Sequence, residues 1–360
     1  MVVLTIQTEV KQAIEKEAKA NIMSEEVKKF KVTVDGQTVE VDPGTTILEA
    51  ARLIGGQSVP PAMCYYKPLE SSGGRCRTCL VEVSKGSDAD PRPMPKLVAS
   101  CRTTVMDGME IKNLESERTQ EARKAVTEFL LVNHPLDCPI CDQAGECHLQ
   151  DLGYEHGVSH SRTEFERRTF EPEDIGPHIK LHMNRCILCA RCVLAANQLT
   201  EGRDHGILFR GEHAEISTYL NKALESDFYG NVIDVCPVGA LTDRTSRFAS
   251  RVWFTKPMDA SCQCDKCSGK VVLWMKGEEV IRVTARQNQY GESEEWICNT
   301  CRFEKKDVKY WNLEGPRAID RHSVISLNHY QKPKNEHLKL ENLGAKELSA
   351  EDQKQAEDQV

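Results

Sequence analysis

Sixteen cysteines in 360 residues are the side chains of this chain best suited to chemistry. None occurs before Cys64 or after Cys301, and between these limits they gather in local groups, often with two residues between neighbours. A cysteine-rich apolar core would instead scatter them at apolar periodicity. Thiolates at such intervals are typical ligands of iron–sulfur clusters or zinc.

The first group comprises Cys64, Cys76, Cys79 and Cys101. Four thiolates can hold two bridged irons, which predicts a [2Fe–2S] centre. The small residues of the loop at 71–74 would let backbone N–H groups approach the sulfurs. A structural zinc site is the alternative, although zinc sites usually pair two Cys-x2-Cys units or add a histidine pair.

The second group, Cys138, Cys141 and Cys147, supplies three thiolates, one short of a four-iron cube. His134 lies four residues before Cys138, and its rival His148 adjoins Cys147, where the geometry is less favourable. A neutral imidazole in place of a thiolate should raise the reduction potential. Spacing alone leaves open whether His134 is the fourth ligand of this [4Fe–4S] site.

The third group begins like a bacterial ferredoxin run, with Cys186, Cys189 and Cys192. Ala196 stands where the run requires a Cys-Pro pair, and that pair occurs instead at Cys236-Pro237. The pattern is that of a two-cluster ferredoxin with one cluster deleted. It predicts a [4Fe–4S] cluster held by Cys186, Cys189, Cys192 and Cys236.

Five cysteines remain, and four of them form two Cys-x2-Cys pairs, Cys264 with Cys267 and Cys298 with Cys301. These pairs predict a site for [4Fe–4S] or Zn²⁺, with Cys262 as a fifth candidate and free thiols as a further alternative. The cofactors expected are one [2Fe–2S], two [4Fe–4S], and a third [4Fe–4S] or a zinc ion.

Several function classes are excluded by composition. The N-terminal segment 1–27 is rich in glutamate and lacks the features of an export signal, so we expect a reducing compartment in which disulfides do not persist. No apolar run approaches the length of a membrane-spanning helix, which is about 20 residues. The net charge of −8 gives no support for nucleic-acid binding.

The elements that position the first group are an expected hairpin and helix. Alternating β-branched residues around Asp35-Gly36 predict a hairpin over 30–41, and apolar spacing predicts a helix over 46–54, ended by Gly55. A hairpin followed by a helix is how a β-grasp domain begins. The residues expected on the buried side of the helix are Ile47, Ala50, Ala51 and Ile54.

Further elements are expected around the other groups. Ser116 should cap a helix over 116–132 that ends before Pro135. Segments 184–198 and 232–243 carry cysteines, and the alternation over 271–283 predicts another hairpin. The apolar stripe expected on the 116–132 helix is Ala122, Ala125, Val126, Phe129 and Leu130.

The expected fold class is α+β with four small domains. The N-terminal extension is a short helix or disordered arm, and the C-terminal segment is a disordered tail or, alternatively, a solvated helix. In order, the segments are 1–27, the extension; 28–107, a β-grasp [2Fe–2S] ferredoxin domain; 108–152, a helical His/Cys3 [4Fe–4S] module; 153–254, a ferredoxin-like [4Fe–4S] domain; 255–310, a small Cys-rich β domain; and 311–360, the tail.

Taken in this order, the first three groups resemble the N-terminal part of the large iron–sulfur subunit, the G subunit, of bacterial NADH:quinone oxidoreductase, respiratory complex I. The resemblance covers about residues 28–310, and it implies that His134 is a ligand. In that family a molybdopterin-enzyme-like domain follows, so the chain resembles a truncated form. The family motifs C-x2-C-x3-C and C-x2-G-R-F are altered here, with Val271 at the third position and Cys301 in place of glycine.

The resemblance implies an electron-relay subunit of an oxidoreductase. Its partners would be a flavin-bearing, NADH-oxidising subunit and other iron–sulfur subunits that lead to quinone. No G-x-G-x-x-G motif occurs, so we expect no NADH site or other catalytic substrate site in this chain. The expected location is peripheral, on the cytoplasmic side of the bacterial inner membrane, with membrane contact only through the complex.

Two other functions stay open. An electron-relay subunit of an NAD-linked hydrogenase or formate dehydrogenase would share the first three sites. A multi-zinc interaction module would have no redox role, but the Cys-x2-Cys-x2-Cys run with a distant Cys-Pro is not a zinc pattern.

Overall fold

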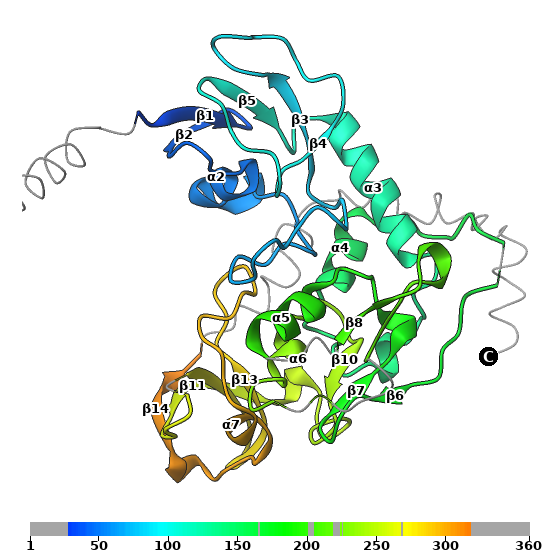
Figure 1. Ribbon diagram of the computed structural model, residues 1–360, viewed down its shortest axis with the longest axis vertical. Helices are drawn as coiled ribbons and strands as arrows, with labels where there is room; N and C mark the ends of the chain where they lie inside the picture. Colours follow the sequence, from blue (N-terminus) through cyan, green and yellow to red (C-terminus); the bar gives the residue numbers. More distant parts are fainter. Residues whose placement is uncertain are drawn as a thin grey trace, which may run out of the picture. The chain divides into compact units, whose positions relative to one another are not determined.

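The computed structural model describes residues 28–164, 166–200, 205–218, 224, 226–267 and 269–317 (Figure 1). By their contacts these residues divide into two compact units, one formed by residues 28–60 and 81–119 and the other by residues 61–80 and 120–317. The predictions for segments 1–27 and 331–360 concern residues outside this range. Mixed α and β structure, as predicted, is confirmed.

The first unit contains a five-stranded sheet in the order β2-β1-β5-β3-β4. The predicted hairpin is confirmed, with Val34 of β1 paired to Gln37 of β2. Asp35 and Gly36 turn the chain with φ of 45° and 78°, the left-handed conformation that a two-residue hairpin turn needs. The strands are β1 (Phe30–Val34), β2 (Gln37–Val41), β3 (Leu80–Lys85), β4 (Val98–Ala99) and β5 (Met109–Lys112).

Helix α2 (Ile47–Ile54) completes the core of the first unit. Thr46 caps it by accepting the N–H of Glu49 at 3.3 Å, and Gly55 ends it with φ of 79°. The predicted apolar side is confirmed, because its residues belong to the cluster around the sheet. That cluster contains Val32, Val34, Val41, Ile47, Ala50, Ala51, Val81, Val83, Val105, Met109 and Ile111, with Ile54 packed at its edge.

The second unit contains short helices and strands, and most cysteines of the second and third groups lie between them or at helix ends. Helix α5 packs against α6 and β8 around an apolar core. Strands β10, β7 and β6 form a three-stranded sheet, and β8 pairs with β9. The elements are α4 (His148–His156), β6 (Glu173–Asp174), β7 (Ile179–Leu181), α5 (Arg191–Leu199), β8 (His205–Leu208), β9 (Glu215–Thr218), α6 (Asn231–Val235) and β10 (Leu241–Asp243).

Helix α3 (Glu117–Leu131) exists as predicted, and Ser116 caps it by accepting the N–H of Thr119 at 3.2 Å. Its predicted apolar stripe is confirmed only at Leu130, which packs against an apolar cluster; Ala125 is exposed and Phe129 is 77% exposed. The buried face is polar and contains Arg123 and Thr127. A polar contact therefore outweighs apolar periodicity in deciding which side of this helix is buried.

Arg123 makes that contact. It is 1% exposed, and its guanidinium donates to two backbone carbonyls, those of Thr78 at 3.2 Å and Leu80 at 3.3 Å. These residues flank Cys79, so the helix holds a cysteine-bearing loop by hydrogen bonds. A buried arginine with carbonyl partners satisfies polar groups that apolar side chains would leave unpaired.

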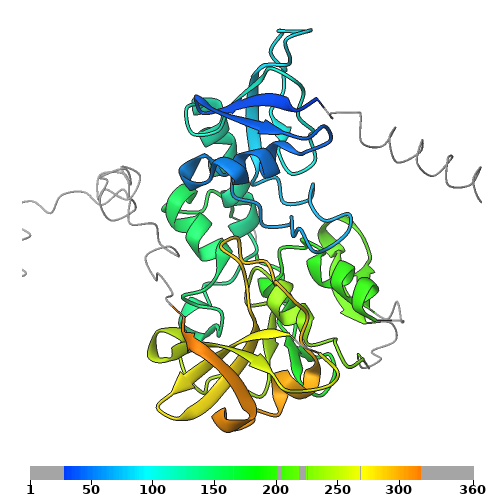
Figure 2. The ribbon, with the colours of Figure 1, turned by 90° about the vertical axis from the view of Figure 1, so that its left-hand side faces the viewer.

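A four-stranded antiparallel sheet in the order β13-β12-β11-β14 forms the C-terminal part of the second unit, drawn in yellow and orange in Figure 2. The predicted 271–283 hairpin is confirmed as β12 (Lys270–Lys276) and β13 (Glu279–Ala285). The sequence did not predict β11 (Lys256–Cys262) or β14 (Trp311–Pro316). Since β14 pairs with β11, this sheet runs past the predicted boundary at residue 310. The short helix α7 (Asn299–Phe303) packs against β13.

Within the described part of the chain, no helix combines the length and the apolar character needed to cross a membrane.

The polar anchor on α3 predicts that Arg123→Ala destabilises the chain more than Phe129→Ala, although the sequence favoured Phe129 as the core residue. Removing Arg123 leaves buried carbonyls unpaired, at a cost of about 2–3 kcal/mol. Truncating the exposed Phe129 should change the free energy of unfolding by less than about 0.5 kcal/mol. Urea unfolding followed by circular dichroism measures both, and equal losses would contradict the assignment.

Candidate metal centres

The four cysteines of the third group line one cavity in the second unit. The remaining wall is apolar and consists of Leu181, Ile187, Ala190, Ile216, Val238, Ala240 and Leu241. A cavity with an apolar wall and four cysteine thiols in its lining has the donor set that a [4Fe–4S] cluster requires.

The backbone of the 186–192 run turns its N–H groups toward sulfur. Leu188 and Ala190 have φ of 53° and 62°, and the N–H of Leu188 donates to the Cys186 sulfur at 3.3 Å. Helix α5 then begins at Arg191. Non-glycine residues in this conformation cost energy, and they persist where the surrounding structure imposes them.

Burial dominates the ionisation of these thiols. It raises the pKa of Cys189 to about 11 and that of Cys147, in the second group, to about 12. It also raises the pKa of Cys236, although the N–H groups of Val238, Ala240 and Leu241 oppose the shift. Because the thiols hold their protons at neutral pH, a metal that binds here must displace them.

The second group occupies the stretch between α3 and α4. His134 continues the last turn of α3 through an N–H bond to Leu131 at 3.1 Å. Burial, reinforced by the charge of Arg185, lowers the pKa of His134 to about 4, so its imidazole is neutral at pH 7 and keeps a lone pair for a metal. Burial lowers the pKa of His148 to about 4 as well, so protonation does not discriminate between the two candidates.

Position distinguishes the two histidines better than protonation does. The ring of His148 lies against Gly291, where an added Cβ would come within 2.9 Å of the imidazole. The same residue lines the polar cavity beneath the C-terminal sheet. His148 is thus already part of the contact between α4 and the 286–293 loop.

The segment 236–239 joins the second and third groups. Cys236 lines the apolar cavity, while three residues later Gly239 lies so close to Cys141 that a Cβ at this position would overlap its sulfur. The sulfur of Cys147 lies 3.9 Å from the Pro237 carbonyl oxygen. One short stretch of backbone therefore contacts cysteines of both groups, and a side chain at position 239 would displace the Cys141 sulfur.

Three cysteines of the first group, Cys64, Cys76 and Cys79, are buried in the second unit. The N–H groups of Arg75 and Cys76 donate to the Cys64 sulfur at 3.2 and 3.3 Å. Positive φ at Gly73 and Gly74 forms the loop that aims them. Cys101, the fourth residue of the predicted set, belongs to the first unit, where it is buried after β4.

A single apolar cluster connects cysteines of all three groups within the second unit. Its buried members are Met63, Cys64, Cys76, Cys147, Leu149, Leu152, Cys189, Val238 and Ala240, and Cys186 and Cys236 pack against it. Side chains from positions as distant in the sequence as Met63 and Ala240 thus form one continuous, water-poor contact.

Arg191 ties the third group to the loop of the first. It is 3% exposed and donates to the carbonyls of Ala62 at 2.9 Å and Tyr65 at 2.6 Å, on either side of Cys64. Its guanidinium also lies 5.1 Å from the centre of the Tyr66 ring. In the sequence, only the position of Arg191 between Cys189 and Cys192 hinted that it contacts a cysteine loop.

The fourth group is the most compact. The ligand atoms of Cys262, Cys264, Cys267 and Cys301 all lie within 4.8 Å of one another, the one such set among the residues that the structure describes. The Cys298 sulfur lies 3.8 Å from the Cys264 sulfur, but Cys298 is not a member of the set of four. The sequence had placed Cys298 among the four and Cys262 as the fifth.

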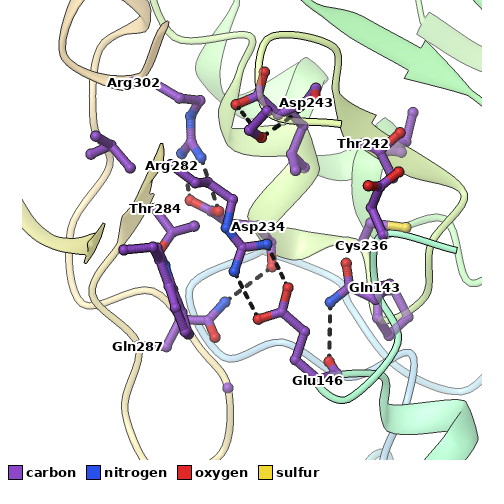
Figure 3. Close-up of a pocket in the computed structure, with 18 of the residues that line it drawn as sticks. Gln143, Glu146, Asp234, Cys236, Thr242, Asp243, Arg282, Thr284, Gln287 and Arg302 are labelled. Atoms are coloured by element: carbon purple, nitrogen blue, oxygen red, sulfur yellow. Dashed lines mark hydrogen bonds and ion pairs between the residues drawn. The ribbon is translucent and has the colours of Figure 1, made fainter. Parts of the chain in front are cut away.

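A polar cavity lies between the second group, the third group and the C-terminal sheet (Figure 3). Arginines of β13 and α7 bind acidic residues that stand beside cysteines of the second and third groups. Arg282 of β13 binds both carboxylate oxygens of Glu146, at 2.5 and 2.9 Å, and Arg302 of α7 binds both oxygens of Asp234. Glu146 directly precedes Cys147, and Asp234 lies two residues before Cys236. These arginines were missed from the sequence, because their partners are distant in the chain.

Three family models match separate parts of the chain. They are described as a 2Fe-2S iron-sulfur cluster binding domain, over residues 27–116; an NADH-ubiquinone oxidoreductase-G iron-sulfur binding region, over 123–162; and the ferredoxin-like domain of NADH-quinone oxidoreductase subunit 3, over 176–242. Each covers the stretch in which the sequence predicted a centre of the corresponding kind.

Curated relatives are subunits of NADH-quinone or NADH-ubiquinone oxidoreductases. The NADH-quinone oxidoreductase G subunit of Rickettsia bellii is 38% identical over 299 residues, which are 83% of this chain and 42% of that protein. The NADH-ubiquinone oxidoreductase 75 kDa subunit of Reclinomonas americana is 43% identical over 285 residues, 79% of this chain and 39% of the relative. The chain spans about two fifths of the length of these curated relatives.

A solved structure is also similar. One chain of a crystal structure of NAD+-reducing [NiFe]-hydrogenase in the H2-reduced state matches with a TM-score of 0.53 and 27% identity, over 62% of this chain and 91% of the hydrogenase chain. The domain matches and the relatives agree with the order of the cysteine groups. The chain belongs to the family of NADH-quinone oxidoreductase G subunits and contains its 2Fe-2S and 4Fe-4S binding regions.

Proposed function

We propose that this chain is an iron–sulfur electron-transfer subunit of an NADH-quinone oxidoreductase. It receives electrons from a flavin-bearing, NADH-oxidising subunit and passes them to other iron–sulfur subunits on the way to quinone. The observation that carries this proposal is the single apolar cluster that connects cysteines of the first three groups. Electron transfer between centres requires short distances, and this cluster brings cysteines of the three groups into one contact network.

The proposed ligands follow the sequence prediction. Cys64, Cys76, Cys79 and Cys101 hold the [2Fe–2S] cluster; His134, Cys138, Cys141 and Cys147 hold one [4Fe–4S] cluster; and Cys186, Cys189, Cys192 and Cys236 hold the other. When bound, these iron–sulfur clusters supply one-electron oxidation and reduction.

The chain's own residues set the conditions for that chemistry. Apolar side chains such as Leu149 and Val238 exclude water from the thiolates, and N–H groups such as that of Leu188 stabilise negative charge on sulfur. The neutral imidazole of His134 removes one negative charge from its site. Arg191 brings a positive charge beside two groups at once.

The alternative is a relay subunit of an NAD-linked hydrogenase, which the similarity to the NAD+-reducing [NiFe]-hydrogenase chain favours over a formate dehydrogenase. Both functions use the same three centres. Affinity purification of the intact complex separates them, since quinone-linked membrane subunits support the first proposal and a nickel-containing subunit supports the second. For the first, we propose a peripheral position on the membrane complex.

Iron content tests the relay itself. Anaerobically purified chain should be brown, bleach with dithionite, and contain about ten irons, two from one centre and four from each of the others. Cys189→Ala should remove about four irons and one [4Fe–4S] EPR signal while the [2Fe–2S] signal remains. A colourless, zinc-only preparation would favour the multi-zinc module.

The two candidate histidines can be separated by reduction potential. His134→Cys should retain the cluster and lower its midpoint potential by on the order of 100 mV, because a charged thiolate replaces a neutral ligand. His148→Gln, which keeps a neutral polar group in the same buried region, should leave that potential unchanged. EPR-monitored redox titration measures both, and the opposite pattern would assign the ligand to His148.

The shared 236–239 segment predicts the behaviour of Gly239→Ala. Its new methyl group would overlap the Cys141 sulfur, which is fixed once it binds iron, so this variant should lose about four irons from the His134 site. Gly153→Ala is the matched control, since a Cβ there meets no atom within 4 Å and alanine favours the helix. Full iron retention in Gly239→Ala would contradict the proposed role of Cys141.

A further inference from the structure

The fourth cysteine group has a geometry of its own. Around Cys264 the sulfur separations are 3.7 Å to Cys262, 3.4 Å to Cys267 and 3.4 Å to Cys301. The Cys262 and Cys267 sulfurs lie 3.4 Å apart, and those of Cys267 and Cys301 lie 4.0 Å apart. These are five of the six edges of a tetrahedron of sulfur atoms.

The edge length identifies the kind of occupant. Four sulfurs at the tetrahedral Zn–S distance of about 2.3 Å lie about 3.8 Å from one another. The observed separations surround that value. In a four-iron cube each thiolate binds a different iron at an outer corner, so the sulfurs must stand much further apart. The arrangement therefore fits one ion and not the cluster that the related C-x2-C-x3-C motif suggests.

The surroundings fit a closed structural site. Three of the four cysteines are buried, in an apolar cluster with Val271, Leu273 and Trp311 that is separate from the cluster joining the other three groups. The N–H of Cys267 donates to the Cys264 sulfur at 3.3 Å, and the N–H of Cys298 donates to the Cys267 sulfur at 3.3 Å. Backbone donors of this kind stabilise the charge that remains when four thiolates bind a divalent ion.

We propose that Cys262, Cys264, Cys267 and Cys301 bind a single Zn²⁺ in a tetrahedral site, with Cys298 outside the ligand set. Binding displaces the four thiol protons and leaves a net charge of −2, with no change in oxidation state. Zinc has no redox chemistry, so this centre takes no part in electron transfer.

The ion has a structural purpose that can be traced through the chain. It joins the end of β11, the 264–267 loop and α7. Cys301 directly precedes Arg302, which is 1% exposed and binds Asp234 beside the Cys236 loop (Figure 3). Fixing α7 therefore fixes the arginine that binds helix α6, which ends next to Cys236.

Metal analysis of the anaerobically purified full chain tests the proposal. We expect one zinc in addition to the irons of the other sites, with zinc-edge X-ray absorption showing four sulfurs at about 2.3 Å. Four further irons with an additional EPR signal, a single iron at this site, or no metal would each overturn it. The zinc content and the zinc-edge spectrum test this site independently of the relay function. The relay function is tested by the iron content of the first three sites.

A pair of matched variants tests the ligand set. Cys262→Ser should lower zinc content at least tenfold in the presence of a competing chelator, whereas Cys298→Ser should retain zinc. Loss of zinc in Cys298→Ser together with retention in Cys262→Ser would instead support the two Cys-x2-Cys pairs as the ligands and overturn the set proposed here. Iron content shows whether each variant has folded, and if Cys262→Ser fails to accumulate, the X-ray absorption of the unaltered chain decides.

Discussion

Burial of many thiols within a small volume is the constraint on which the second unit depends. A buried thiolate is costly without a partner, and the raised pKa values of Cys147, Cys189 and Cys236 express that cost. The proposed metals would provide the compensating charge, and their binding would be coupled to the folding of this unit. The first unit has a conventional apolar core around its sheet, and only Cys101 there belongs to a predicted site.

Buried arginines hold the cysteine loops in place. Arg123 binds carbonyls on either side of Cys79, Arg191 binds carbonyls on either side of Cys64, and Arg302 binds the carboxylate near Cys236. Loops rich in glycine and cysteine have few apolar side chains with which to pack. Guanidinium groups satisfy the backbone of such loops and at the same time place positive charge near the cysteines proposed to bind the clusters.

Local patterns predicted much of the fold and the candidate site. The hairpins turn at Asp35-Gly36 and Gly277 because those residues adopt positive φ, and cysteine spacing located the third group completely around one cavity. The buried face of α3 could not be found this way, since apolar periodicity cannot foresee an arginine whose carbonyl partners belong to a loop much earlier in the chain. For the same reason β14 was missed, because it pairs with β11, a strand that the whole β12–β13 hairpin and helix α7 separate from it in sequence.

The fourth group explains why a metal site can change its role while the order of domains stays the same. The apolar cluster around the fourth group is distinct from the cluster that connects the first three groups. A metal bound at the fourth group therefore does not lie within the contacts that connect the other three. A centre in that position can lose redox activity without interrupting transfer between the others. What it must still do is hold α7, because Arg302 stands next to Cys301 and compensates a carboxylate that is itself buried. A redox-inert ion such as Zn²⁺ meets that requirement. Because it is neither oxidised nor reduced, the contact between Arg302 and Asp234 beside Cys236 does not depend on the oxidation state of the other centres.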